Sequence, residues 1–160
     1  MPMAEDGPTQ ELVIRQATVD DLSLIEALDR YSDSPLRDIH HDLQKYFGSL
    51  DPSMHERNVI FLAALDALTV GKAELVLAPT SLPTRVGYVK RVIVHPAYRR
   101  HHIARRLMEV VVTFAREQGL AFLDLHVFEQ NLSARRLYES LGFQEEHREL
   151  YYRLSLSNEQ

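Results

Sequence analysis

Apolar and polar residues alternate along some stretches of this chain and recur at helical spacing along others. Alternation from Leu12 to Ala17 predicts a first strand. Further strands are predicted over 59–65, 73–78, 85–94, 122–128, 143–144 and 150–156, and helices over 22–31, 37–50, 102–119 and 131–141. Short connections between the middle strands imply antiparallel pairing, and the strand–helix–strand unit over 85–128 implies a parallel crossover. The pattern therefore predicts a mixed α/β fold, a mostly antiparallel sheet of about seven strands with flanking helices.

Composition narrows the class of protein. A length of 160 residues suggests one domain, residues 1–160, in which residues 1–10 fray. The 45% hydrophobic and 26% charged content is that of a soluble globular protein, and no apolar run approaches the roughly 20 residues of a membrane span. The chain has no cysteine, which excludes disulfides, metal sites with cysteine ligands and a cysteine nucleophile. We expect a cytoplasmic protein with no membrane partner, and a net charge of −5 argues against a general nucleic-acid binder.

One stretch combines a buried strand, a basic turn and a helix. Val92–Val94 is a β-branched run, Pro96 should end the strand, and the helix should begin at about His102. The turn between them carries Arg99, Arg100, His101 and His102. Unsatisfied N–H groups at a helix N-terminus attract anions, and arginines match phosphate geometry. The stretch predicts a site for a pyrophosphate-sized anion, against the simpler alternative of a strand–helix turn with solvated arginines.

This stretch resembles the acyl-CoA signature of the Gcn-related N-acetyltransferase (GNAT) superfamily, Arg/Gln-x-x-Gly-x-Gly/Ala. Arg99 matches its first position and Ala104 its last, whereas His102 stands where the family usually has glycine. We expect His102 to adopt helical dihedral angles and to aim its ring elsewhere. The opening Ile14-Arg15-x-Ala-Thr-x-x-Asp also resembles the first strand and helix of many members.

A second motif strengthens the resemblance. Residues 131–143 are similar to the family pattern Asn-x-x-Ala-x-x-Leu-Tyr-x-x-x-Gly-Phe at every named position. An amphipathic helix capped by Asn131 and Gly142 would explain part of this pattern, but not its place one strand after the first signature. Together with the opening strand, the resemblance covers nearly the whole chain.

The resemblance implies transfer of acetyl from acetyl-CoA to a primary amine of a small molecule or peptide, with no metal. It implies that pyrophosphate lies on the backbone amides that follow Arg99 and that the pantetheine arm lies along Val92–Val94. The residues expected to bind acetyl-CoA are Val92, Ile93, Val94, Arg99, Arg100, His101, His102, Ile103, Ala104, Arg105, Asn131, Ala134 and Tyr138.

Two catalytic residues are expected. Tyr138 matches the family tyrosine that protonates the leaving thiolate, although it could instead only pack and hydrogen-bond the sulfur. Many members carry a glutamate base at the place of Tyr88, and the ribosomal-protein N-terminal acetyltransferases carry one at the place of His126. A neutral imidazole can accept a proton near pH 7, so His126 is the candidate base, against a structural strand histidine. Glu129 and a water relay are further possibilities.

The sequence is also compatible with other functions. The position of His126 also suggests a protein N-terminal acetyltransferase, and His102 with Tyr88 would fit a catalytically weak CoA-binding sensor. The acceptor is expected to bind around 32–54 and 79–84. His40 and His41 point about 100° apart on a helix and are poor joint metal ligands. A homodimer is possible.

Overall fold

The structure is a computed structural model that describes residues 11–32, 37–48, 50, 56–78 and 85–158. Its internal contacts divide the chain into two units, one ending at His126 and the other beginning at Val127, which are described separately below. The predicted fraying of residues 1–10 and much of the expected acceptor region, including all of 79–84, lie outside the described residues.

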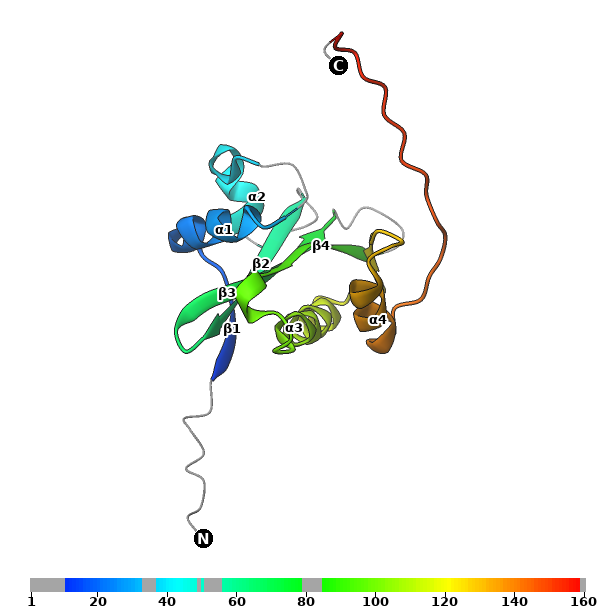
Figure 1. Ribbon diagram of the computed structural model, residues 1–160. Coiled ribbons are helices and arrows are strands. Elements are labelled where there is room, and N and C mark those ends of the chain that lie inside the picture. The colour runs from blue at the N-terminus through cyan, green and yellow to red at the C-terminus, as the bar shows by residue number, and fades with distance from the viewer. Residues whose placement is uncertain (1–10, 33–36, 49, 51–55, 79–84, 159–160) are drawn as a thin grey trace. The chain divides into compact units, whose positions relative to one another are not determined.

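The first unit is built on one sheet in which sequence order is spatial order. Strands β1 to β4 pair antiparallel, and β5 pairs parallel with β4 (Figure 1). The mixed α/β fold is therefore confirmed. The strands are β1 Leu12–Gln16, β2 Arg57–Leu65, β3 Leu68–Leu77, β4 Val86–Val94 and β5 Phe122–Leu125.

Helices cover both faces of this sheet. Helices α1 (Leu22–Asp29) and α2 (Leu43–Phe47) lie on one side, and the long α3 (Ile103–Glu117) lies on the other (Figure 1). Single 3₁₀ turns occupy Val19–Asp21, Ile39–Asp42 and Pro96–Tyr98. In the second unit, α4 runs over Leu132–Ser140.

One predicted helix, residues 37–50, is wrong as a single element. It forms a 3₁₀ turn followed by the five-residue α2, because two aspartates each cap a separate start. The Asp38 carboxylate accepts the His40 N–H at 3.0 Å, and the Asp42 carboxylate accepts the Lys45 N–H at 3.0 Å.

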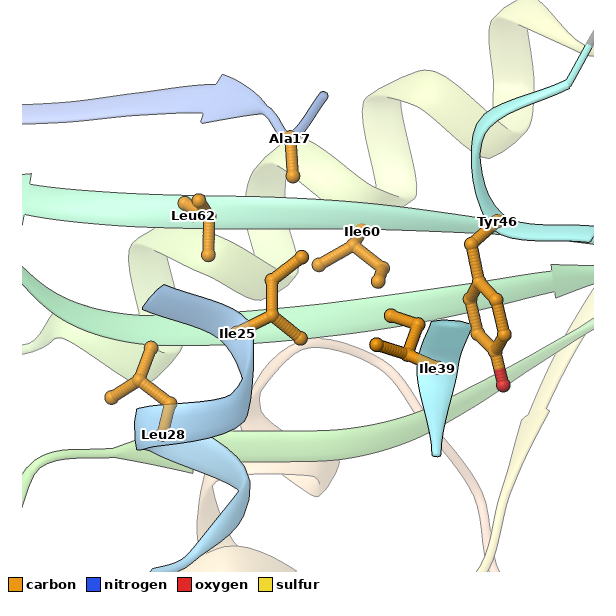
Figure 2. Close-up of a cluster of buried hydrophobic side chains, with 7 residues drawn as sticks. All are labelled: Ala17, Ile25, Leu28, Ile39, Tyr46, Ile60 and Leu62. Carbon is orange, nitrogen blue, oxygen red and sulfur yellow. The ribbon is translucent and has the colours of Figure 1, made fainter. Parts of the chain in front are cut away.

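The predicted apolar faces of α1 and of the 37–50 region form much of the core. Figure 2 shows Ile25, Leu28, Ile39 and Tyr46 gathered over Ile60 and Leu62 of β2, with Ala17 beside them. The helical spacing of apolar residues in 22–31 and 37–50 also predicts that Tyr31 and Leu43 face the core, but they are 45% and 39% exposed. Burial of this cluster fixes α1 and α2 on their face of the sheet.

Helix α3 lies close against the other face. Leu107, Met108 and Val111 are fully buried, and a Cβ at Gly71 would meet Ile103 at 3.1 Å and Leu107 at 3.3 Å. Glycine at this place lets the first turn of α3 approach β3 closely.

Two strand predictions are wrong. Strand β5 ends at Leu125 rather than at residue 128, because β4 no longer pairs with it beyond that point. Residues 143–158 form no strand, so the described sheet has five strands rather than about seven. Alternation gives a segment the preference for a strand, but a strand exists only where a neighbouring strand satisfies its backbone. Here Leu150, Tyr152, Leu154 and Leu156 are each at least 80% exposed.

The opening motif is held by an ion pair. The Arg15 guanidinium donates to both oxygens of Asp21 at 2.7 Å, and the Thr18 N–H donates to the same carboxylate at 2.8 Å. The hydrogen bonds from Arg15, together with that from Thr18, outweigh burial and lower the pKa of Asp21 to about 2.

We expect Asp21→Asn to destabilise the protein in a pH-dependent way. The folded-state pKa of Asp21 lies below its unfolded value near 4, so its stabilisation is present above about pH 4 and is lost as the pH falls toward about 2. Urea unfolding should show a loss of roughly 1–2 kcal/mol at about pH 7 that shrinks at low pH. The exposed neighbour Asp20, replaced by asparagine, is the matched control, and a loss that did not depend on pH would contradict the ion-pair explanation.

Candidate functional site

Strand β4 contains a bulge. Its register with β3 shifts by one residue, so that Ala73 faces both Arg91 and Val92. Arg91 takes a left-handed φ of 51°, a conformation that is costly for a residue with a side chain. Strained backbone of this kind persists where the surrounding structure holds it, often at a functional site. The bulge lies immediately before the residues predicted to carry the pantetheine arm.

Strand β4 also continues beyond its parallel neighbour. The β4–β5 register runs from Val86↔Phe122 to Val89↔Leu125, and β5 then ends while β4 continues to Val94. On the other side, the β3 ladder is prolonged by a 2.7 Å hydrogen bond from the His95 N–H to the Val70 carbonyl. The end of β4 therefore presents to its β5 side an edge that β5 does not cover. Such an edge can bind an extended ligand through main-chain hydrogen bonds.

The turn after β4 is strained as well. The His95 ring accepts the Ala97 N–H at 3.1 Å and starts the 3₁₀ turn that contains Pro96. Arg100 then takes a φ of 71° and His102 a φ of 58°, both left-handed. The prediction of helical dihedral angles for His102 is wrong, because this residue is the N-cap of α3 and turns the chain into it. This conformation is the one that glycine adopts most readily.

The same turn joins an array of cations to the N-terminus of a long helix. The 15-residue α3 begins at Ile103, and the partial positive charge of its N-terminus adds to Arg99, Arg100, Arg105 and Arg106. Backbone that alternates between left-handed and other conformations forms concavities of N–H groups that suit anions. The turn therefore combines positive charge with a helix N-terminus, two features that favour anions.

In the second unit, capping residues define both ends of α4. The Asn131 side chain accepts the Ala134 N–H at 3.2 Å, and Gly142 ends the helix with a φ of 99°. Tyr138 is half-buried, with its ring 5.9 Å from that of Phe143. Burial raises the pKa of Tyr138, so its phenol keeps its proton to higher pH than an exposed tyrosine.

Two predicted positions on β4 and at the end of β5 are in contact. The Tyr88 hydroxyl is hydrogen-bonded to Nδ1 of His126, and the ring centroids are 5.4 Å apart. The two residues are neighbours because β4 and β5 run parallel and Tyr88 is in register with Asp124, two residues before His126.

This geometry agrees with a comparison of the sequence with known families. The sequence model of the acetyltransferase (GNAT) family matches residues 19–143, more than three quarters of the chain. The chain belongs to the GNAT acetyltransferase family. As a member of this family it is an acetyl-CoA-dependent N-acetyltransferase.

Two bacterial proteins are similar in sequence to this GNAT protein. Over 143 residues, which cover 88% of this chain and 82% of the relative, it is 30% identical to the IAA acetyltransferase of Azospirillum brasilense. Over 63 residues it is 35% identical to the uncharacterized N-acetyltransferase YycN of Bacillus subtilis strain 168, a match that spans only 39% of this chain and 40% of that protein. Among solved structures, the aminoglycoside N-acetyltransferase AAC(6')-Iy in complex with CoA is similar with a TM-score of 0.73 at 19% identity. That match covers 95% of this chain and 99% of AAC(6')-Iy.

The predicted acetyl-CoA residues of the GNAT protein fall into two groups. Val92–Val94 and Arg99–Arg105 follow each other along the end of β4, the strained turn and the first turn of α3. Asn131, Ala134 and Tyr138 all lie on α4 or at its cap, and Ala134 and Tyr138 are one helical turn apart. Within each unit the structure brings together the residues that the motifs named.

Sequence reasoning missed a ring of buried charges next to this site. Lys72 and Glu74 of β3 are fully buried, and Asp29 at the end of α1 is 4% exposed. The Lys72 ammonium lies 2.7 Å from Asp29 and also contacts Glu74, while Arg37 donates to Asp29 at 3.1 Å and to both oxygens of Glu74. Burial alone would raise the pKa of Glu74, but its bonds to Arg37 and Lys72 lower it. In the sequence, Lys72 and Glu74 are two residues apart, a spacing that places them on the same face of a strand. That spacing does not indicate that the two charges are buried.

An aromatic contact near the turn was also missed. The Tyr31 hydroxyl is 3.1 Å from Nε2 of His95, with the ring centroids 4.8 Å apart, and the Tyr98 ring centroid is 5.6 Å from that of His95. This contact holds the end of α1 against the turn that follows β4.

The adjacent histidines have separate acidic neighbours. His40 lies 2.7 Å from Glu26, and His41 lies 3.2 Å from Asp38. Among the residues that the structure describes, no group of three or more histidines and carboxylates could hold a metal, and no helix is long and apolar enough to cross a membrane.

We expect His102→Gly to be neutral or stabilising, unlike most glycine substitutions. Relief of the left-handed conformation gains roughly 1–2 kcal/mol, against about 0.5–1 kcal/mol of extra chain entropy in the unfolded state. The matched control is His101→Gly, because His101 lies between the two left-handed residues but is not left-handed itself. Urea unfolding should place His101→Gly below the wild type and His102→Gly at or above it. The reverse order would show that His102 is not strained.

Proposed function

We propose that this protein acetylates a primary amine of a small molecule or peptide by direct attack of the amine on acetyl-CoA. The observation that carries the proposal is the end of β4, which continues past β5 into a strained, arginine-rich turn at the start of α3. The turn supports binding of the pyrophosphate by the amides and side chains of residues 99–105, and the open β4 edge supports binding of the pantetheine arm along Val92–Val94. N–H groups of that edge would polarise the thioester carbonyl.

In the proposed reaction, the amine nitrogen attacks the thioester carbonyl carbon, the C–S bond breaks, and the leaving thiolate takes a proton. Tyr138 would supply that proton, in keeping with the raised pKa that keeps its phenol protonated at neutral pH. Asn131 and Ala134 would hold the cofactor beside it. These roles follow from the family motif, which Tyr138 matches within a regular helix.

The attacking amine must first lose a proton, and His126 is the proposed base. Its Nδ1 is hydrogen-bonded to the Tyr88 hydroxyl, which orients the ring. Once the imidazole has taken a proton from the substrate, Nδ1 carries a hydrogen and donates it to the tyrosine oxygen, which favours the imidazolium that forms. Tyr88 thus occupies the place of the glutamate of many relatives and would position the base rather than act as one.

The proposal is tested by release of free thiol from acetyl-CoA against a panel of primary amines, including aminoglycosides and a peptide with a free N-terminus. We expect acetylated product from at least one amine, identified by its mass. Binding of acetyl-CoA in a thermal-shift titration without transfer to any amine would favour the sensor alternative and overturn the proposal. Transfer only to peptide N-termini would favour the N-terminal acetyltransferase alternative.

We expect His126→Gln to lose the acidic limb of the pH–rate profile. Activity that depends on a neutral imidazole falls as the pH is lowered and the imidazole takes up a proton. The variant should have a rate that is lower by about 10²-fold and that lacks this fall at low pH. The control is His147→Gln, since His147 is exposed and lies beside Glu149. A variant profile with the wild-type shape would remove His126 from the mechanism.

A further inference from the structure

The sheet face that carries Tyr88 changes from apolar to charged across its width. The α1–α2 face of β2 presents Ile60 and Leu62 to the core. In the antiparallel register these two are opposite Glu74 and Lys72 of β3, and Glu74 is in turn opposite Lys90 of β4. Residues directly opposite each other in antiparallel strands share a face. Lys90 and Tyr88, two residues apart before the bulge, therefore lie on the same side of β4.

The charges on this face do not all have partners. The two carboxylates, Asp29 and Glu74, are both engaged by Arg37 and Lys72, so that the ring holds two negative and two positive groups. Lys90 is the third cation and is half-buried. Among the described residues, none lies within ion-pair or hydrogen-bond distance of its ammonium, and Glu74 acts on it only at longer range.

Such a cation is unfavourable without a ligand. Burial lowers the pKa of Lys90, and Lys45, Arg37 and Arg91 add to this effect against the pull of Glu74. A half-buried charge without a partner costs free energy that an anion beside it would return. Because the ring is already neutral, the compensating anion has to come from outside these residues.

The position of Lys90 indicates which molecule could bring that anion. On the opposite face of β4, Val89 is 3% exposed, and a Cβ at Gly87 would meet Leu120 at 2.7 Å, so that face is packed at these two positions. A substrate that reaches the β4 edge beyond β5 would therefore approach from the side of Tyr88 and Lys90. An acceptor that places its amine near His126 would then have another part of its structure near Lys90.

We propose that Lys90 binds an anionic group of the acceptor, so that the preferred substrate is a primary amine that also carries a carboxylate. This inference rests on the proposed function and specifies its acceptor. The ammonium of Lys90 would pair with the carboxylate and orient the amine, and it would repel acceptors with several positive charges.

The test uses ω-amino acids of increasing length, from glycine to 6-aminohexanoate, each compared with its amide and with the diamine of matching length. For the best length, the wild type should prefer the acid over the amide by at least about 10-fold in kcat/KM. In Lys90→Met this preference should disappear, mainly through a higher KM for the acid. Lys90→Arg should keep the preference, and Lys90→Glu should shift it to the diamine.

The control is Arg116→Met, because Arg116 is an exposed cation in the last turn of α3, outside the residues proposed to bind the acceptor. It should leave the preference unchanged, and binding of acetyl-CoA should be the same in all variants. Equal use of acids, amides and diamines by the wild type, or an unchanged preference in Lys90→Met, would overturn the role of Lys90 and leave the proposed function intact. No transfer to any amine, with acetyl-CoA bound, would instead overturn the proposed function.

Discussion

Replacement of Lys72 by methionine is expected to lower the free energy of unfolding by about 3–5 kcal/mol, because it removes one partner from a buried set of charges. Lys72 is fully buried, and its ammonium contacts both Asp29 and Glu74. Without it, two carboxylates share the single cation of Arg37 in a site that water does not reach. The measurement is urea unfolding at about pH 7.

A double-mutant cycle separates this electrostatic effect from a loss of packing. Glu74→Gln removes the other side of the pair, and in the double variant the remaining Asp29 and Arg37 still neutralise each other. We expect the double variant to lose less than the sum of the two single losses, by at least about 1 kcal/mol. Losses that add would mean that the ring stabilises the fold only through packing.

Replacement of Tyr138 by phenylalanine is expected to reduce turnover by about 10²-fold or more and to change the affinity for acetyl-CoA little. The substitution removes only the hydroxyl, and the aromatic contact with Phe143 is retained. The lost rate reflects expulsion of the thiolate without a proton donor. Steady-state kinetics give the turnover, and a thermal-shift or calorimetric titration gives the affinity.

The control for this prediction is Tyr151→Phe, since Tyr151 is 82% exposed on the segment that follows α4. It should leave both quantities unchanged. If Tyr138→Phe lost turnover and affinity to the same extent, Tyr138 would be a residue that binds the cofactor and not the acid. In the wild type, the raised pKa places any loss of activity caused by ionisation of the phenol above the usual range of tyrosine.

The proposed roles of Tyr88 and Lys90 share one structural cause. Both lie on the stretch of β4 before the bulge at Arg91 and on the same side of the strand. Because of the bulge, Ile93 is opposite Lys72 and lies on that face of the sheet. Regular alternation would place Val92 and Val94 there instead. One left-handed residue thus marks where the polar part of the strand ends and the part proposed to carry the cofactor begins.

The sequence by itself determined the elements that depend on local interactions. Asn131 and Gly142 bound α4, Gly119 follows α3 with a φ of 72°, and Pro96 stands just beyond the end of β4, as their side chains and dihedral preferences require. The two motifs also indicate the GNAT family, to which the chain belongs.

Only the tertiary structure decided the features that depend on distant neighbours. Tyr88 and His126 are in contact because the two strands that carry or precede them, β4 and β5, run in parallel although α3 separates them in sequence. In the ring of buried charges, Lys72 contacts Asp29, which is more than 40 positions away in the sequence. The left-handed Arg91 and His102 go against their local preference, because the ladder with β3 and the start of α3 hold them there. Likewise, residues 150–156 have the alternation of a strand but form none, since a strand requires a partner that a sequence pattern alone cannot supply.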